Sequence, residues 1–93
     1  MSPETKIVIP AQVMSRQVGD ETVILDLGSG MYFGLDPVGA RIWQLHSEGQ
    51  HVDAVVSTLL GEYHVTEDQL RHDVSGLISE LASRGLVEVS DPA

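Results

Sequence analysis

Cysteine is absent from this 93-residue chain, and cations are scarce: 5 lysines and arginines stand against 14 aspartates and glutamates, for a formal net charge of −9. Without cysteine the chain has no disulfide, no thiol nucleophile and no thiolate metal ligand. Because affinity for nucleic acid rests largely on lysine and arginine neutralising phosphates, the few scattered cations disfavour DNA and RNA as partners. No apolar run approaches the length that spans a bilayer, and the first residues lack a secretory pattern. These absences predict a cytoplasmic protein without a membrane segment.

The residues that usually carry catalysis or bind metal form no recognisable pattern. The four histidines are 5, 13 and 8 residues apart, so none makes the i, i+4 pair that places two imidazoles on one helix face. The carboxylates cluster at turns and predicted helix starts, where acids favour the helix dipole. Serines fall outside a nucleophile elbow, and glycines fall outside the dinucleotide spacing. We therefore predict no enzyme, no metal site and no cofactor.

Hydrophobic periodicity predicts one domain over residues 1–93, with an ordered core at about 7–89 and a frayed tail over residues 1–6. Three short strands are expected at residues 13–18, 23–27 and 31–35, joined by glycine turns as an antiparallel meander. Three helices follow, ending near Gly49, Gly61 and Gly85, and residues 86–89 predict a brief extended tail. This order is α+β, a three-stranded antiparallel sheet followed by three helices. It also describes a winged helix-turn-helix, a fold shared by DNA readers and by domains that never touch DNA.

Local signals support the helix boundaries. Asp36 stands where an N-cap belongs, and Pro37 occupies the first helical position, where its missing N–H costs nothing. Thr66 and Gln69 match a capping box at the start of the third helix.

The predicted third strand is apolar or glycine throughout, so it is a candidate edge for a peptide that adds as a further strand. In the third helix an apolar ridge is assigned to the core, and the stripe beside it, with smaller side chains, could form the other wall of a slot. The alternative is that Met31, Phe33 and Leu35 simply face the core while Tyr32 is half-exposed. Periodicity alone favours that alternative.

Several segments together resemble the PqqD-like family, which includes the leader-binding proteins of ribosomally made peptide pathways, the RiPP recognition elements. The match runs over roughly residues 13–88, and no single motif is decisive. The segments are Tyr-Phe-Gly-Leu-Asp at residues 32–36, Gly39, Ile42-Trp43, Gly-Glu-Tyr-His-Val at residues 61–65 and Glu-Leu-Ala-Ser-Arg-Gly-Leu-Val at residues 80–87. The resemblance implies a winged-helix-like domain with a three-stranded sheet packed on three helices.

The resemblance also implies a site. In the family, the leader of a precursor peptide lies as an added strand against the third strand, in a groove closed by the third helix. Carried over to this chain, Arg71 would suit a leader carboxylate, and the apolar positions would suit an aromatic or aliphatic anchor. The implied peptide-binding residues are Met31, Tyr32, Phe33, Gly34 and Leu35 on the strand, and Arg71, Val74, Ser75 and Ile78 on the helix.

A freestanding domain of this length is most similar to the split leader-binding protein of lasso-peptide pathways. That protein works with a separate cysteine protease, so we expect a precursor peptide and such a maturation enzyme as partners. One alternative is a PqqD-type chaperone that delivers a precursor to a radical-SAM enzyme. An alternative of another class is a winged-helix DNA-binding regulator, which the net charge disfavours.

Overall fold

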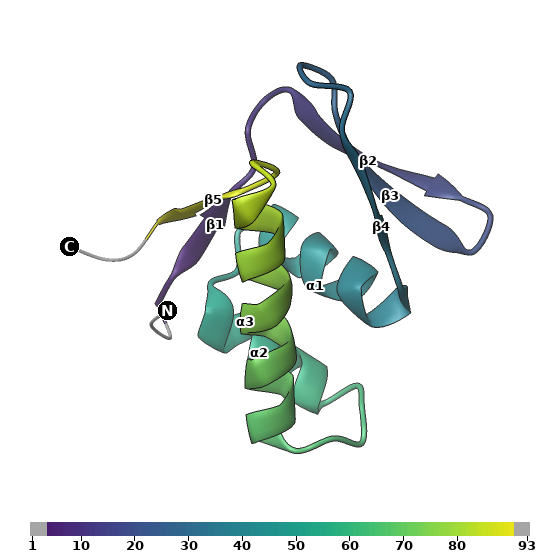
Figure 1. Cartoon of the computed structure of the whole chain (residues 1–93). Helices are drawn as coiled ribbons and strands as arrows, with labels where there is room; N and C mark the ends of the chain where they lie inside the picture. Colours follow the sequence, from purple (N-terminus) through teal and green to yellow (C-terminus); the bar gives the residue numbers. More distant parts are fainter. Residues whose placement is uncertain (1–3, 91–93) are drawn as a thin grey trace.

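The computed structural model describes residues 4–90, and its main sheet is an antiparallel meander. Strands β2 (Val13–Val18), β3 (Glu21–Asp26) and β4 (Tyr32–Leu35) pair in the order β2-β3-β4. Helices α1 (Pro37–Ser47), α2 (Val52–Leu60) and α3 (Glu67–Ser83) follow and gather on one side of this sheet (Figure 1). The predicted α+β class is confirmed. Within the described part of the chain, no helix is both long and apolar enough to cross a membrane.

The helices begin at caps that the sequence predicts. The Asp36 carboxylate accepts a hydrogen bond from the Gly39 amide at 2.7 Å, and Pro37 opens α1. The Thr66 hydroxyl accepts from the Gln69 amide at 3.1 Å, as in a capping box. The second half of the box is replaced, because the Gln69 side chain donates forward to Asp73 at 2.8 Å. Gly85, at φ +73°, ends α3 as predicted.

A second, two-stranded sheet ties the two ends of the described chain together. Strand β1 (Lys6–Val8) pairs antiparallel with β5 (Glu88–Ser90). Thr5, just before β1, is fully buried, and its carbonyl accepts from the Val52 amide at 2.9 Å. The predicted frayed tail is therefore wrong for residues 5 and 6, while residues 1–3 lie outside the described residues. A strand of three residues whose partners lie 80 to 84 positions away is too short to show an alternating pattern in the sequence.

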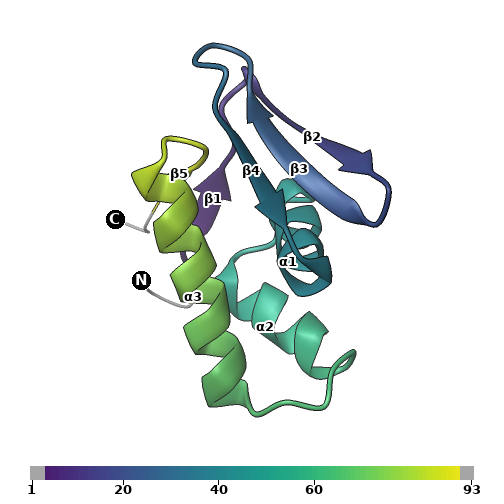
Figure 2. The same ribbon diagram turned by 45° about the vertical axis from the view of Figure 1, so that its right-hand side comes forward.

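The core has two parts that meet along α1 and α3. One lies among the helices and contains Leu45, Val55, Leu59 and Val74 with their neighbours. The other lies between the inner face of the sheet, α1 and the C-terminal part of α3. Its buried members are Val13, Ile24, Leu35, Trp43, Leu81, Leu86 and Val87. This second part fixes β4 over α1 with α3 to one side (Figure 2).

One buried polar side chain lies at the end of α1. His46 is 5% exposed, and its Nδ1 lies 3.0 Å from the Gln50 carbonyl oxygen. Its other ring nitrogen, Nε2, is buried and has no hydrogen-bond partner among residues 4–90. Burial lowers the pKa of His46, and the hydrogen bond to Gln50 offsets part of that effect. The neutral imidazole is therefore the form that the fold favours.

Candidate functional site

Strand β4 is an edge strand whose outer backbone groups face away from the sheet. The Asp26 amide donates to the Met31 carbonyl at 2.8 Å, which sets the phase of the β3–β4 ladder. In an antiparallel ladder, bonded and non-bonded pairs alternate, so Phe33 and Leu35 bond to β3. The N–H and C=O groups of Tyr32 and Gly34 therefore point to the free edge. A peptide laid along β4 would find two donors and two acceptors there.

The side chains of β4 also alternate between two faces. Phe33 and Leu35 point inward, Leu35 being 4% exposed, whereas Tyr32 is 72% exposed on the outer face. The alternative from periodicity, in which Met31 also faces the core, is wrong for that residue: Met31 is 40% exposed. Met31 also uses its backbone in the turn, because its amide donates to the Ser29 hydroxyl at 3.2 Å. Tyr32 and Gly34 are thus the positions of β4 whose backbone groups are best placed to pair with a ligand.

A pocket of about 450 Å³ lies beyond the end of β4, between the start of α1 and the middle of α3. Val38, Ile42 and Leu77 supply apolar surface, and Asp36 and Asp73 supply carboxylates. Gly76 lies on its α3 side, and a Cβ added to Gly76 would meet nothing within 4 Å. The missing side chain keeps this part of the helix surface open. The pocket is lined by Asp36, Val38, Gly39, Ile42, His72, Asp73, Gly76 and Leu77.

The surface between β4 and α3 extends from this pocket to Phe33 and Arg84, near the C-terminal end of α3. The guanidinium carbon of Arg84 lies 5.0 Å from the centroid of the half-buried Phe33 ring, a cation–π distance. Arg84 also bonds to Glu80 at 2.9 Å, one turn earlier on α3. At the Leu35 end of β4 lie Asp20, Glu21 and Asp36 around a second hollow of about 400 Å³. The region therefore has a cation at one end and carboxylates at the other.

The α3 residues that the family resemblance implies for the groove are not among the residues that line the pocket at Gly76. Val74 and Ile78 are 0% and 1% exposed and pack in the core among the helices, so neither side chain lines an open groove in this structure. Arg71 turns toward α2, where it bonds to Asp53 at 2.6 Å, and it also bonds to Glu67 at 3.0 Å. These hydrogen bonds, to Asp53 first and then Glu67, raise the pKa of Arg71.

The remaining member, Ser75, bonds within its own helix, with its hydroxyl donating to the Arg71 carbonyl at 2.8 Å. The stripe nearest β4 and the pocket is instead made of Asp73, Gly76, Leu77 and Arg84. One signal pointed to it: an interior helix glycine costs about 1 kcal/mol relative to alanine, which indicates a reason other than helix stability.

The chain matches the family described as coenzyme PQQ synthesis protein D (PqqD) over residues 21–87. The chain belongs to the PqqD family. The match begins at β3 and runs through β4 and all three helices, so it contains both walls of the candidate site. The resemblance read from the sequence is thereby confirmed. A comparison with curated proteins finds no match.

Two solved structures are similar to this PqqD-family chain. "TbiB1 in Complex with the TbiA(beta) Leader Peptide" has 38% sequence identity and a TM-score of 0.81, covering 87% of this chain and 94% of TbiB1. "Lasso peptide synthetase B1 complexed with the leader peptide" has 25% identity and a TM-score of 0.83, covering 89% of this chain and 98% of that protein. Both are complexes of a domain of this fold with a leader peptide.

Proposed function

We propose that this PqqD-family chain binds the leader region of a ribosomally made precursor peptide as a strand added to β4. The observation that carries the proposal is the free edge at Tyr32 and Gly34, which lies beside a pocket that α3 keeps open at Gly76. The two similar structures, both leader-peptide complexes, support the same ligand class. An extended leader would bond to the β4 backbone, and an apolar anchor would enter the pocket.

The chemistry of the pocket indicates what that anchor is. The side chains of Val38, Ile42 and Leu77 favour an aliphatic or aromatic group, and burying such a group contributes about 1.5–3 kcal/mol. Asp36 and Asp73 at the same pocket favour a cationic or amide group nearby in the leader. On the α3 side, we propose that the groove is lined by Asp73, Gly76 and Leu77 and not by the helix face that contains Arg71.

Delivery, and not catalysis, is the activity that we propose. Ordering a leader that is disordered when free costs about 2–5 kcal/mol, which lowers its affinity and allows reversible binding. Once bound, it holds the rest of the precursor at a high effective concentration near a partner enzyme. The partner that we propose is a separate leader protease in the cytoplasm, as the sequence resemblance to the split leader-binding proteins of lasso-peptide pathways implies; the similar lasso peptide synthetase B1 supports the leader peptide as the ligand.

Backbone substitutions test the binding mode directly. Gly34→Pro removes an outward amide that the ladder does not use, so the domain should stay folded while a fluorescently labelled precursor leader binds at least about tenfold more weakly. Gln17→Pro, at the far edge of the sheet, is the matched control and should leave leader affinity unchanged. Equal affinities for the native chain and Gly34→Pro, with both folded by circular dichroism, would exclude strand addition on β4.

A second candidate, which the sequence resemblance implies, is a PqqD-type chaperone that delivers the precursor to a radical-SAM enzyme; the matching family is described as coenzyme PQQ synthesis protein D. Both candidates bind a precursor, so the partner decides between them. Faster leader cleavage by a protease in the presence of the chain supports the lasso-type assignment. Faster modification of the precursor's core by a radical-SAM enzyme, with no effect on cleavage, supports the chaperone.

A DNA-binding regulator remains the candidate of another class, and α3 argues against it. The exposed residues of this helix include Glu67, Asp68, Asp73 and Glu80, which would oppose phosphates. Titration of a labelled DNA duplex at low salt should give no binding; a salt-dependent isotherm would contradict the proposal.

A further inference from the structure

The sheet has a second free edge, on β2, at the side opposite β4 (Figure 2). The Leu27 amide donates to the Gln12 carbonyl at 2.9 Å, in the same register as the β2–β3 ladder. By alternation, Met14, Arg16 and Val18 bond to β3, whereas the backbone groups of Ser15 and Gln17 point outward. Within the described residues, no other strand covers this edge.

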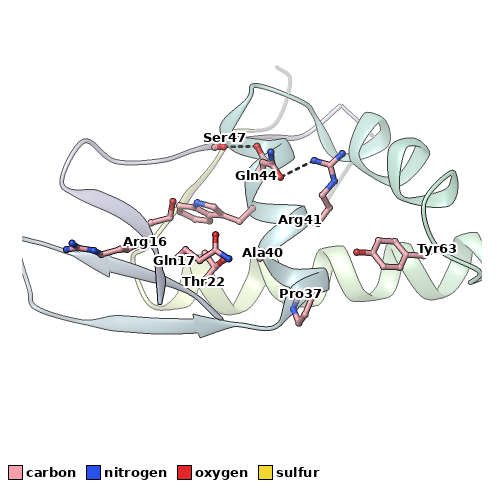
Figure 3. Close-up of a pocket in the computed structure, with 11 residues that line it drawn as sticks. Arg16, Gln17, Thr22, Pro37, Ala40, Arg41, Gln44, Ser47 and Tyr63 are labelled. Carbon is pink, nitrogen blue, oxygen red and sulfur yellow. Dashed lines mark hydrogen bonds between the residues drawn. The ribbon is translucent and has the colours of Figure 1, made fainter. Parts of the chain in front are cut away.

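Below this edge lies a cleft of about 560 Å³, between the inner side of the β2–β3 hairpin and α1. Figure 3 shows Gln17 and Thr22 on the side of the sheet, with Arg41 and Gln44 on α1. Most of the lining side chains carry a hydroxyl or an amide, and Trp43 and Tyr63 add aromatic surface. The lining residues are Ser15, Arg16, Gln17, Thr22, Pro37, Ala40, Arg41, Trp43, Gln44, Ser47 and Tyr63.

The charge of this cleft differs from that of the chain as a whole. No aspartate or glutamate is among its lining residues, although the chain has a formal net charge of −9. Two of the five cations, Arg16 and Arg41, are among the lining residues, although the alternation of β2 puts the Arg16 side chain on the face of the sheet opposite Ser15 and Gln17. Arg41 is already paired with Glu62 at 2.6 Å, whereas Arg16 makes no ion pair within residues 4–90. The cleft is therefore complementary to polar side chains, and the β2 edge at Arg16 is complementary to an acidic one.

We propose that the β2 edge and this cleft form a second strand-addition site, which takes an extended, polar or acidic segment of the partner processing enzyme. The proposal rests on the proposed function, because a delivery protein must contact a second protein. The segment would bond to the backbone of Ser15 and Gln17 and place alternate side chains among the hydroxyls and amides of the cleft. The leader on β4 and the enzyme on β2 would then extend the same sheet from its two sides.

A second copy of this chain fits the β2 edge poorly. In an antiparallel pairing of two β2 strands with Ser15 opposite Gln17, the Arg16 side chains of both copies would lie directly opposite each other. Like charges in that position destabilise a strand pair, and two chains of net charge −9 also repel each other. An acidic side chain of another protein placed opposite Arg16 would instead form a favourable cross-strand pair.

The test combines proline substitutions at the two edges of the full chain. Ser15→Pro and Gln17→Pro remove outward amides that the β2–β3 ladder does not use. The purified leader protease that cleaves the precursor is the probe. We expect each variant to co-elute less with the protease and to raise the KM for precursor cleavage about tenfold, as loss of one interfacial hydrogen bond would. Their affinity for the labelled leader should stay at the native value, while Gly34→Pro shows the reverse pattern.

A side-chain variant covers the case in which a proline variant does not fold. Ser47→Trp fills the cleft from α1 without touching the core, and its matched control is Ser57→Trp, an exposed position of α2 outside the cleft. Hydrogen exchange in the native chain should slow at Ser15 and Gln17 when the protease is added. Native co-elution and KM in folded Ser15→Pro and Ser47→Trp would overturn the proposal, as would a concentration-dependent dimer that both variants abolish. If the proposed function itself is wrong, the labelled leader will not bind to the native chain, and this result is distinct from a failure of the β2 site.

Discussion

The most informative single substitution is at Gly76, in the middle of α3. Glycine there is unfavourable by about 1 kcal/mol relative to alanine, and an added Cβ would meet nothing within 4 Å. Gly76→Ala should therefore raise the free energy of unfolding by about 1 kcal/mol, which corresponds to about 4–8 °C in Tm for a domain of this size. Gly76→Leu keeps most of the gain in helix propensity and directs an isobutyl group into the pocket between α1 and α3.

These two variants separate stability from binding. Thermal unfolding followed by circular dichroism measures the stability of each variant, and the fluorescence anisotropy of a labelled leader measures its affinity for the leader. We expect Gly76→Leu to weaken leader binding at least about tenfold, because its side chain occupies the volume meant for the apolar anchor. Ser79→Leu, an exposed position of α3 outside the pocket, is the matched control and should bind as the native chain does. Native affinity in Gly76→Leu would refute the placement of the anchor pocket, and a lower Tm in Gly76→Ala would refute the packing argument.

Three further predictions concern His46, Asp36 and Arg71. Burial lowers the pKa of His46 below its unfolded value of about 6.5, so the unfolded chain binds more protons and stability falls as the pH drops through and below that value. Denaturant unfolding between pH 7.5 and 5.5 should show a shallower loss in His46→Leu, and equal slopes would contradict the assignment. Asp36→Ala removes the α1 cap and should cost about 1 kcal/mol, measured as a lower Tm; an unchanged Tm would mean that the cap contributes nothing. Arg71→Met should keep leader affinity within about twofold of the native value, because Arg71 is paired with Asp53 and Glu67. A loss of affinity of about tenfold in the anisotropy assay would show that Arg71 contributes to leader binding.

Much of the fold could be predicted because its signals are local. Asp36-Pro37, Thr66 with Gln69, and Gly85 mark helix ends within one turn, and the change from alternating to helical periodicity separates the sheet from the helices. The β1–β5 pair could not be predicted in this way. Each of its strands has only three residues, and their partners lie at opposite ends of the sequence.

The candidate site was only half predictable for a similar reason. The β4 edge follows from strand order, which the turns at residues 19–21 and 28–30 indicate. Which side of α3 faces β4 depends instead on how the helices pack, and Val74 and Ile78 went to α1 and α2. An apolar residue of a helix can face either neighbour with the same periodicity. The glycine at position 76, inside a helix, was the feature of the sequence that distinguished the β4 side of α3 from the side that packs on α1 and α2.

The pairing of β1 with β5 has a consequence for how the chain can be rearranged. Lys6 and Ser90 are partners across that ladder, so positions 84 residues apart in sequence are neighbours in space. A short linker could join them, and new termini could open in the exposed segment between α2 and α3 at Gly61 and Glu62. Such a circular permutant would keep every strand pair, both free edges of the main sheet and the pocket at Gly76. Attachment of a processing enzyme at the new termini would then place it beside the end of α2.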